Sequence, residues 1–404
     1  RGVPGGGVGG YVGFADGPGG SGGSGGAGSG GRSAVRDGAA ASGAGAGAGV
    51  VEPWAVPLGS RSRVNPASAC AWLAQALYCS GPGLTAARLD PADGRVAWSV
   101  PASAAPGRTA ESGAPLYAAG LVLAAAPGSE TVLALDPATG AERWRRKLPQ
   151  GAKVVPAGPQ TLLAAPDGGV TGLDSATGSP RWTKQLGGPG SLWCAGPELP
   201  GAGGAAVLYV ATPAADGAST QVAEVEPASG TVRRQLRVTG LVEPVGVAQG
   251  GLFLLENDKA SQARAVVRID LGTQAVRRAR LSAPLLQAQA GVGADGTVYV
   301  FGTSGALVAV RGEREEWRLE TGVTVASRPV PGAGQVYLSA PDGRLLAVDA
   351  AGRRLVGQTR PRMADGQNTY AATLPAPVVG GDRVFATAPD GTVFAAPTAN
   401  PASW

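Results

Sequence analysis

One recurring spacing constrains the fold of this chain more than any other feature. An Asp at the end of an apolar run is followed eight residues later by a Trp. Three pairs keep this spacing: Asp90 and Trp98, Asp136 and Trp144, and Asp174 and Trp182. Weaker copies place the position of the Asp at residues 226, 270, 311, 349 and 397. The mean spacing of roughly 44 residues is the length of one four-stranded propeller blade.

Each period also carries an apolar run upstream of the Asp, such as residues 298–301, 336–339 and 384–387. In several periods a turn that contains Gly, such as Asp342-Gly343, joins this run to the next, and Asp-Gly between two apolar runs indicates a tight hairpin. The runs are apolar on both faces, so both faces must be covered. The sequence therefore predicts an all-β fold, an eight-bladed β-propeller of four-stranded antiparallel blades over residues 51–404.

Composition divides the chain into two parts. Residues 1–50 are mostly Gly, Ala and Ser, and such a segment cannot bury enough apolar surface to offset its ordering entropy. We therefore expect 1–50 to be a disordered, flexible linker and 51–404 to be the folded domain. The chain begins at Arg1 and its single Met is Met363, so we expect any signal peptide, lipid anchor or membrane helix to lie upstream of Arg1.

The charged and titratable residues exclude several function classes. The chain has no His, which removes Ser-His-Asp and Cys-His catalysis and zinc sites that contain His. The net charge of +5 is small for 404 residues. It is compatible with weak attraction to anionic envelope polymers, but it is too small to indicate a nucleic-acid partner.

The Ala-Leu-Asp, Thr-Gly and Trp pattern of residues 134–144 resembles the PQQ-like propeller repeat. The Gly-His and Trp-Asp pairs of WD40 blades are missing. The resemblance covers essentially all of 51–404. It is strongest in the second and third repeats and degraded in the fourth and fifth, where Arg234 and Arg278 occupy the Trp position.

The resemblance implies two kinds of relative. Quinone-dependent dehydrogenases of this family hold their cofactor over a disulfide between adjacent Cys residues and beside calcium. Here Cys70, Cys79 and Cys194 are scattered, so we expect no cofactor, no metal and no catalytic residue. BamB-type outer-membrane assembly scaffolds and the extracytoplasmic propellers of actinobacterial receptor Ser/Thr kinases or envelope proteins are the other relatives. We predict a non-catalytic binding or scaffold propeller outside the cytoplasm, with a dehydrogenase-like enzyme or a BamB-type scaffold as the alternatives.

The recurring residues have structural explanations that compete with functional ones. The repeated Asp is expected to cap its own turn, although a ring of ligands is the alternative. The repeated Trp is expected to pack between blades, and a binding platform is the alternative. Basic clusters at the outermost strands are expected to block edge-to-edge pairing, while the alternative is an anionic partner. These clusters are Arg143/Arg145/Arg146/Lys147, Arg233/Arg234, Arg277/Arg278/Arg280 and Arg353/Arg354.

Two predictions concern pairing between distant or facing residues. The last repeat has three strands and no residues left for a fourth, so residues 52–58 are expected to complete it and close the ring. If Ala74-Gln75 is a two-residue turn, Cys70 lies directly opposite Cys79 in a non-hydrogen-bonded pair. We predict a disulfide there, which would place the domain outside the reducing cytosol, while three free thiols are the alternative.

The last prediction concerns the binding face. In a propeller the loops between the second and third strands, and the links between blades, emerge on one face. The longer polar loops are expected there: residues 101–113, 213–219, 257–263 and 360–375. Loops of a scaffold carry function, so a protein or envelope polymer is expected to dock over this face. The candidate binding residues are Asn257, Asp258, Arg362, Asp365, Asn368 and Tyr370. Solvated loops without a partner are the alternative.

Overall fold

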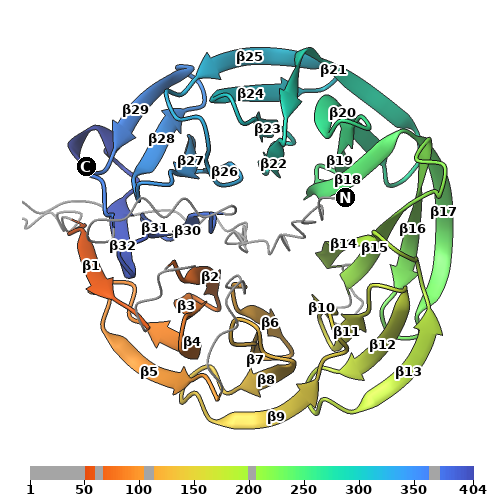
Figure 1. The fold of residues 1–404 in the computed structure, drawn as a ribbon, viewed down its shortest axis with the longest axis horizontal. Coiled ribbons are helices and arrows are strands. Elements are labelled where there is room, and N and C mark those ends of the chain that lie inside the picture. Colours follow the sequence, from red (N-terminus) through yellow and green to blue (C-terminus); the bar gives the residue numbers. More distant parts are fainter. Residues whose placement is uncertain (1–50, 60–66, 104–112, 199–205, 364–373) are drawn as a thin grey trace, which may run out of the picture.

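A computed structural model describes residues 51–59, 67–103, 113–198, 206–363 and 374–404. Within these ranges the chain forms eight sheets of four antiparallel strands each, arranged as blades around a central axis (Figure 1). The predicted all-β, eight-bladed propeller is thereby confirmed. The predicted linker 1–50 lies outside the described residues, so the division of the chain at residue 50 stays a prediction.

Each blade runs from an inner strand a to an outer strand d. The first four blades are β2 (Ala69–Leu73), β3 (Ala76–Gly81), β4 (Leu84–Leu89) and β5 (Val96–Pro101); β6 (Leu116–Ala118), β7 (Leu121–Ala124), β8 (Thr131–Leu135) and β9 (Glu142–Lys147); β10 (Lys153–Ala157), β11 (Gln160–Ala164), β12 (Gly169–Asp174) and β13 (Pro180–Gln185); and β14 (Leu192–Glu198), β15 (Ala206–Pro213), β16 (Ser219–Glu226) and β17 (Thr231–Thr239).

The remaining four blades have the same strand order. They are β18 (Leu241–Ala248), β19 (Gly251–Asn257), β20 (Gln262–Asp270) and β21 (Val276–Leu286); β22 (Gln289–Val292), β23 (Val298–Phe301), β24 (Ala306–Arg311) and β25 (Arg314–Glu320); β26 (Val330–Gly332), β27 (Gln335–Ser339), β28 (Leu345–Asp349) and β29 (Arg354–Gln358); and β30 (Val378–Gly380), β31 (Arg383–Thr387), β32 (Thr392–Pro397) and β1 (Trp54–Pro57).

The eighth blade joins the two ends of the described chain. Strand β1 pairs antiparallel with β32, with Trp54 opposite Ala395 and Pro57 opposite Thr392. The Leu58 N–H continues the ladder by donating to the Gly391 carbonyl at 2.9 Å. Leu58 is buried and packs in one apolar cluster with residues of blades 1 and 8. The predicted ring closure by residues 52–58 is confirmed, and it removes the open edge that β32 would otherwise present.

The strand alternation gives the propeller two faces. The b–c loops and the links between blades emerge at one end, which we call the loop face, and the a–b and c–d turns emerge at the other, the turn face. Most side chains of strands b and c point into the interfaces between neighbouring blades, where they form eight apolar clusters. The core of the domain is therefore a ring of blade interfaces, which holds the loop face rigid.

The register of strands c and d explains where the repeated Trp lies. In blade 2, Trp144 lies opposite Ala134, two residues before Asp136, because a β-bulge separates this pair from the pair Leu135 and Glu142. Blade 5 lacks this bulge, so Arg277 lies opposite Arg268, two residues before the repeated Asp. The expectation that Arg278 occupies the Trp position in the fifth repeat is therefore wrong. Without the extra residue of the bulge, the position opposite Arg268 falls one residue earlier, at Arg277.

Among the described residues, no helix is both long enough and apolar enough to cross a lipid bilayer. The described helical element is the short 3-10 helix η1 (Pro401–Ser403), which packs against β29.

Candidate functional site

A joint between Trp and Gly links neighbouring blades. Each indole N–H donates to a backbone carbonyl of the next blade, at 2.9 to 3.0 Å: Trp54 to Pro91, Trp98 to Pro137, Trp144 to Ser175, and Trp182 to Pro227. Each ring also lies against a Gly in the c–d turn of that blade: Gly94, Gly140, Gly178 and Gly230. All four Gly have positive φ. The repeated Trp therefore packs and docks between blades, and the joint from blade 8 to blade 1 is built like the others.

Three joints lack the Trp and are completed differently. In blade 5, Arg277 Nη1 donates at 3.1 Å to Glu313 Oε1 of blade 6. In blade 4, Arg234 Nη1 donates at 3.0 Å to the Leu271 carbonyl, the position equivalent to the acceptors above, and a cavity of about 30 Å³ lies beside it. In blade 7 the Trp position is Gly357, and a Cβ there would lie 2.1 Å from the Pro401 carbonyl oxygen. Trp404 stacks on Tyr337 of blade 7, with ring centroids 6.1 Å apart. Trp404 also donates from its indole N–H to the Pro397 carbonyl of blade 8 at 2.9 Å, so it serves the joint between blades 7 and 8.

The repeated Asp caps its own turn. Asp136 Oδ1 accepts hydrogen bonds at 3.0 Å from the backbone N–H groups of Ala138 and Thr139, and Asp136 Oδ2 lies 2.6 Å from Arg143 Nη2. Asp174 repeats this arrangement with Arg181 at 2.6 Å. The expected turn-capping role is confirmed. Within the part of the chain that the structure describes, no three His, Cys, Asp or Glu side chains gather in a metal-binding group.

The capping carboxylates predict a stability that falls in acid. Hydrogen bonds from Arg143 and then Thr139 lower the pKa of Asp136 to about 2, and a hydrogen bond from Arg181 lowers that of Asp174. A carboxyl whose pKa is lower in the folded state stabilises that state above its unfolded pKa of about 4 and loses this contribution as the pH falls towards 2. We expect the melting temperature, followed by circular dichroism, to fall between pH 5 and pH 2.

Asp136→Asn should lower the melting temperature at pH 7 and flatten part of this acid dependence. Glu130→Gln, which removes an exposed carboxylate 3.7 Å from Lys147, is the control and should leave the profile unchanged. An acid profile that Asp136→Asn does not alter would contradict a stabilising role for the cap.

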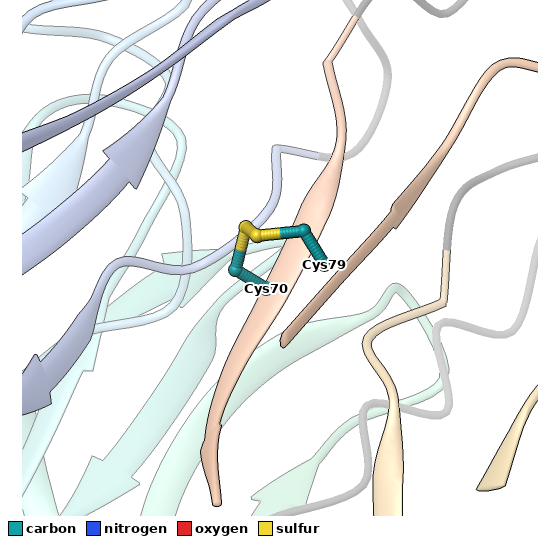
Figure 2. Close-up of a disulfide and its surroundings, with 2 residues drawn as sticks. All are labelled: Cys70 and Cys79. Atoms are coloured by element: carbon teal, nitrogen blue, oxygen red, sulfur yellow. A yellow bond between two sulfur atoms is a disulfide. The ribbon is translucent and has the colours of Figure 1, made fainter. Parts of the chain in front are cut away.

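Cys70 and Cys79 lie directly opposite each other on β2 and β3 and are joined by a disulfide of 2.03 Å (Figure 2). Ala74 and Gln75 form the two-residue turn and both have positive φ, as a tight hairpin turn requires. The Cα atoms are 4.0 Å apart, as in the closer, non-hydrogen-bonded type of cross-strand pair. The third thiol, Cys194, is free and buried, and burial raises its pKa to about 12.

Removing the disulfide should weaken the domain measurably. The double variant Cys70→Ser/Cys79→Ser should lose roughly 2–3 kcal/mol of unfolding free energy, because the unfolded chain regains the entropy of a closed loop. A thiol-free reductant should lower the melting temperature of the unaltered protein and leave that of the double variant unchanged. Equal melting temperatures with and without reductant, or non-reducing peptide maps with three free thiols, would show that the bond does not form.

The strand order places the b–c loops of blades 4 and 5 on the loop face. Most of the two predicted links, residues 104–112 and 364–373, lies outside the described residues, so the gathering of all four loops stays a prediction. Asp258 is engaged within its own loop, where Oδ1 caps Ala260 and Oδ2 lies 2.6 Å from Arg264 Nη2. The Asn257 amide bonds the carboxylate of Glu243 on the inner strand of blade 5. Surrounding protein raises the pKa of Glu243, and this hydrogen bond partly offsets the rise.

Arg362 also lies on the loop face, where its backbone connects the b–c loops of blades 7 and 8. The other three candidate residues, Asp365, Asn368 and Tyr370, lie outside the described residues, so the six are not seen as one group. Asn257 and Asp258 belong to blade 5, and Arg362 lies between blades 7 and 8, so the structure does not place these three side by side. The sequence placed Ser339 at the end of an apolar run and gave it no functional role, although its buried Oγ lies in the interface between blades 7 and 8 without a hydrogen-bond partner.

Residues 82–248 and 260–400 match the family model described as outer membrane protein assembly factor BamB. No curated protein sequence matches the chain. BamB from Moraxella catarrhalis superposes with a TM-score of 0.57 and 15% identity over 84% of this chain and 97% of that chain. Sqt1 from Saccharomyces cerevisiae gives 0.60 and 9% over 85% and 99%. A europium-containing methanol dehydrogenase gives 0.54 and 14% over 78% and 81%. At these identities the structural matches show the fold alone.

The docked Trp rings, capped Asp turns and closed ring define an eight-bladed propeller of PQQ-like repeats. The family match covers most of this propeller. The chain accordingly belongs to the family described as outer membrane protein assembly factor BamB.

Proposed function

We propose that this chain is a non-catalytic scaffold that binds another protein over its loop face, outside the cytoplasm. The observation that carries the proposal is the position of the b–c loops of blades 4 and 5, which both emerge at one end of a closed ring. A rigid ring that presents adaptable polar loops is suited to recognition, because its blades lose little conformational freedom on binding. Membership of a family described by an assembly factor supports a protein as the partner.

The cysteines support the location and the non-catalytic role. A disulfide between β2 and β3 suits an oxidising compartment. It joins residues nine positions apart in the sequence, whereas the quinone enzymes that the repeat resembles use adjacent Cys residues. Incubation with pyrroloquinoline quinone and calcium should give no alcohol- or glucose-dependent dye reduction, and reduction above the rate without protein would contradict a scaffold.

The choice of face can be tested by site-specific photo-crosslinking in the organism that encodes the protein. Crosslinkers at exposed loop-face positions Ala215 and Lys259 should capture one and the same protein, identified by mass spectrometry. Crosslinkers at exposed turn-face positions Ala92 and Ala138 are the matched controls and should not capture it. Capture from the turn face alone, or unrelated proteins at the two loop-face positions, would show that the loop face is not the binding surface.

A further inference from the structure

Arg362 is fixed between two blades on the loop face. Its N–H donates to the Asp342 carbonyl at 2.8 Å, and its own carbonyl accepts from the Asp390 N–H at 3.3 Å. Asp342 and Asp390 belong to the b–c loops of blades 7 and 8. Gly343, with φ +81°, allows this close approach, because a Cβ there would lie 2.7 Å from the Arg362 carbonyl oxygen. The backbone of Arg362 is therefore held in place by both loops.

The side chain of Arg362 is held in position, and no carboxylate of the described residues forms an ion pair with it. Its Cζ lies 4.5 Å from the ring centroid of Phe394 on β32, within the range of a cation–π contact. Its Nε is buried and has no hydrogen-bond acceptor. Burial first, and then the neighbouring Arg360, lower the pKa of Arg362, and Asp390 raises it. Among the described residues Arg362 forms no ion pair, and Asp342 is already paired with Arg344 at 2.6 Å.

A second set of unsatisfied groups lies at the same end of blade 7. Tyr337 packs against blade 8, so Ser339, two residues further along β27, points into the interface that also contains Phe394. Ser339 is 4% exposed, and its buried Oγ has no hydrogen-bond partner. Its N–H donates at 3.0 Å to Ser327 Oγ, which donates at 3.1 Å to the Arg328 carbonyl. Arg328 also forms no ion pair in the described part of the chain, and burial lowers its pKa.

We propose that the Arg362 corner, defined by Arg362, Phe394 and Ser339, binds a carboxylate side chain of the partner protein. An Arg that is desolvated, positioned and unpaired can accept a carboxylate bidentately without first breaking an ion pair. Such preformed Arg contacts are enriched among the residues that dominate protein interfaces. The proposal rests on the proposed scaffold function and adds the chemistry of the partner.

The surroundings favour a protein over a polyanionic polymer. The Asp342 and Asp390 loops flank Arg362 on both sides. The Asp342 carboxylate is paired with Arg344, but the Asp390 carboxylate acts on Arg362 and would repel the further charges of a polyanion. A single carboxylate can reach the guanidinium between them. Met363, the next residue, is 42% exposed and offers an apolar contact to the segment that carries the carboxylate. The corner is therefore suited to an Asp or Glu beside apolar residues.

Panning a random 12-residue phage-displayed peptide library on the full chain tests this proposal. We expect the selected peptides to be enriched in Asp or Glu, and to bind Arg362→Gln roughly tenfold more weakly, as loss of one charged hydrogen-bonded pair predicts. Arg362→Lys should give an intermediate loss. Arg354→Gln removes an exposed Arg that forms no ion pair with the described residues, from the outer strand of blade 7. It is the matched control and should bind like the unaltered protein.

Circular dichroism must show that the variants remain folded. If Arg362→Gln does not fold, the comparison can be made with Arg362→Lys. The proposal is overturned if no acidic peptides are selected, or if Arg362→Gln binds them unchanged. It is also overturned if inorganic polyphosphate, and not acidic peptide, is the ligand lost on substitution. In any of these cases, crosslinking from Ala215 and Lys259 would still report whether the loop face binds a protein, so the two failures are distinguishable.

Discussion

A chain that lacks residues 51–58 should melt roughly 10 °C lower than the unaltered protein and aggregate, because the deletion removes the fourth strand of blade 8. It removes the buried Leu58 and the Trp54 ring that docks on Gly94, together worth roughly 5 kcal/mol or more by analogy with buried truncations. It also exposes the edge of β32, which can then pair with another molecule.

Point variants distinguish the effect of losing the ring closure from the effect of shortening the chain. Trp54→Ala/Leu58→Ala should reproduce most of the loss in melting temperature, while Ala55→Ser, at an exposed position of the same strand, should have no effect. Differential scanning calorimetry and light scattering would measure both consequences. A deletion variant that stays monomeric with an unchanged melting temperature would mean that β1 does not close the ring in solution.

Gly178→Ala should cost roughly 3 kcal/mol of unfolding free energy, which combines two penalties at one position. The residue has φ +68°, a conformation that disfavours any Cβ, and a Cβ there would lie 2.6 Å from the Trp144 indole. Trp144 is only 8% exposed and donates to the Ser175 carbonyl, so the ring cannot move aside without breaking that bond.

Gly312→Ala provides the matched control, because Gly312 also lies in a c–d turn with φ +62° but has nothing within 4 Å of the added Cβ. It should cost only the backbone term, roughly 1–2 kcal/mol. Urea denaturation would measure both variants. Equal losses would indicate that the Trp contact contributes little to the joint, and that the four Gly are required by their turns alone.

The features that the sequence predicted well follow from local rules. The Asp and Trp spacing identified the blades, the count of strands in the last repeat identified β1 as the missing strand, and Ala74-Gln75 set Cys70 opposite Cys79. Each depends on side-chain alternation or turn geometry, which a single sequence carries. To predict that β1 pairs with β32, it was enough to assume that an unpaired strand edge is unfavourable.

The features that the sequence did not predict depend on packing between blades. Arg278 was assigned to the Trp position by counting, yet the missing bulge in blade 5 gives that place to Arg277. The Trp position of blade 7 is Gly357, and two residues from the end of the described chain pack there instead: Pro401 contacts Gly357, and Trp404 stacks on Tyr337. A bulge adds one residue to a strand without a strong sequence signal. A missing Trp can be replaced by any residue that the fold brings close to its position, however far away that residue is in the sequence.

The sequence predicted the face on which the candidate site lies better than it predicted the residues that form the site. The loop face follows from strand order, and Arg362 lies there. The sequence gave Ser339 no role, because its significance arises from a buried hydroxyl that lacks a hydrogen-bond partner, and this can be judged only once the neighbouring blade is placed. Asp258 attracted attention by its charge, but its carboxylate is occupied by its own loop and by Arg264.

Closure through β1 has a consequence for biosynthesis. Strand β1 is made before any complete blade, whereas its partner β32 is made only after the other seven blades. Contacts between such distant segments form slowly, because the entropy of closing a long loop is lost before the contacts contribute any stability. During translation, Trp54 and Leu58 must remain unpaired while seven other blades assemble. Chaperone assistance should therefore matter most for the step in which strand β1 pairs with strand β32.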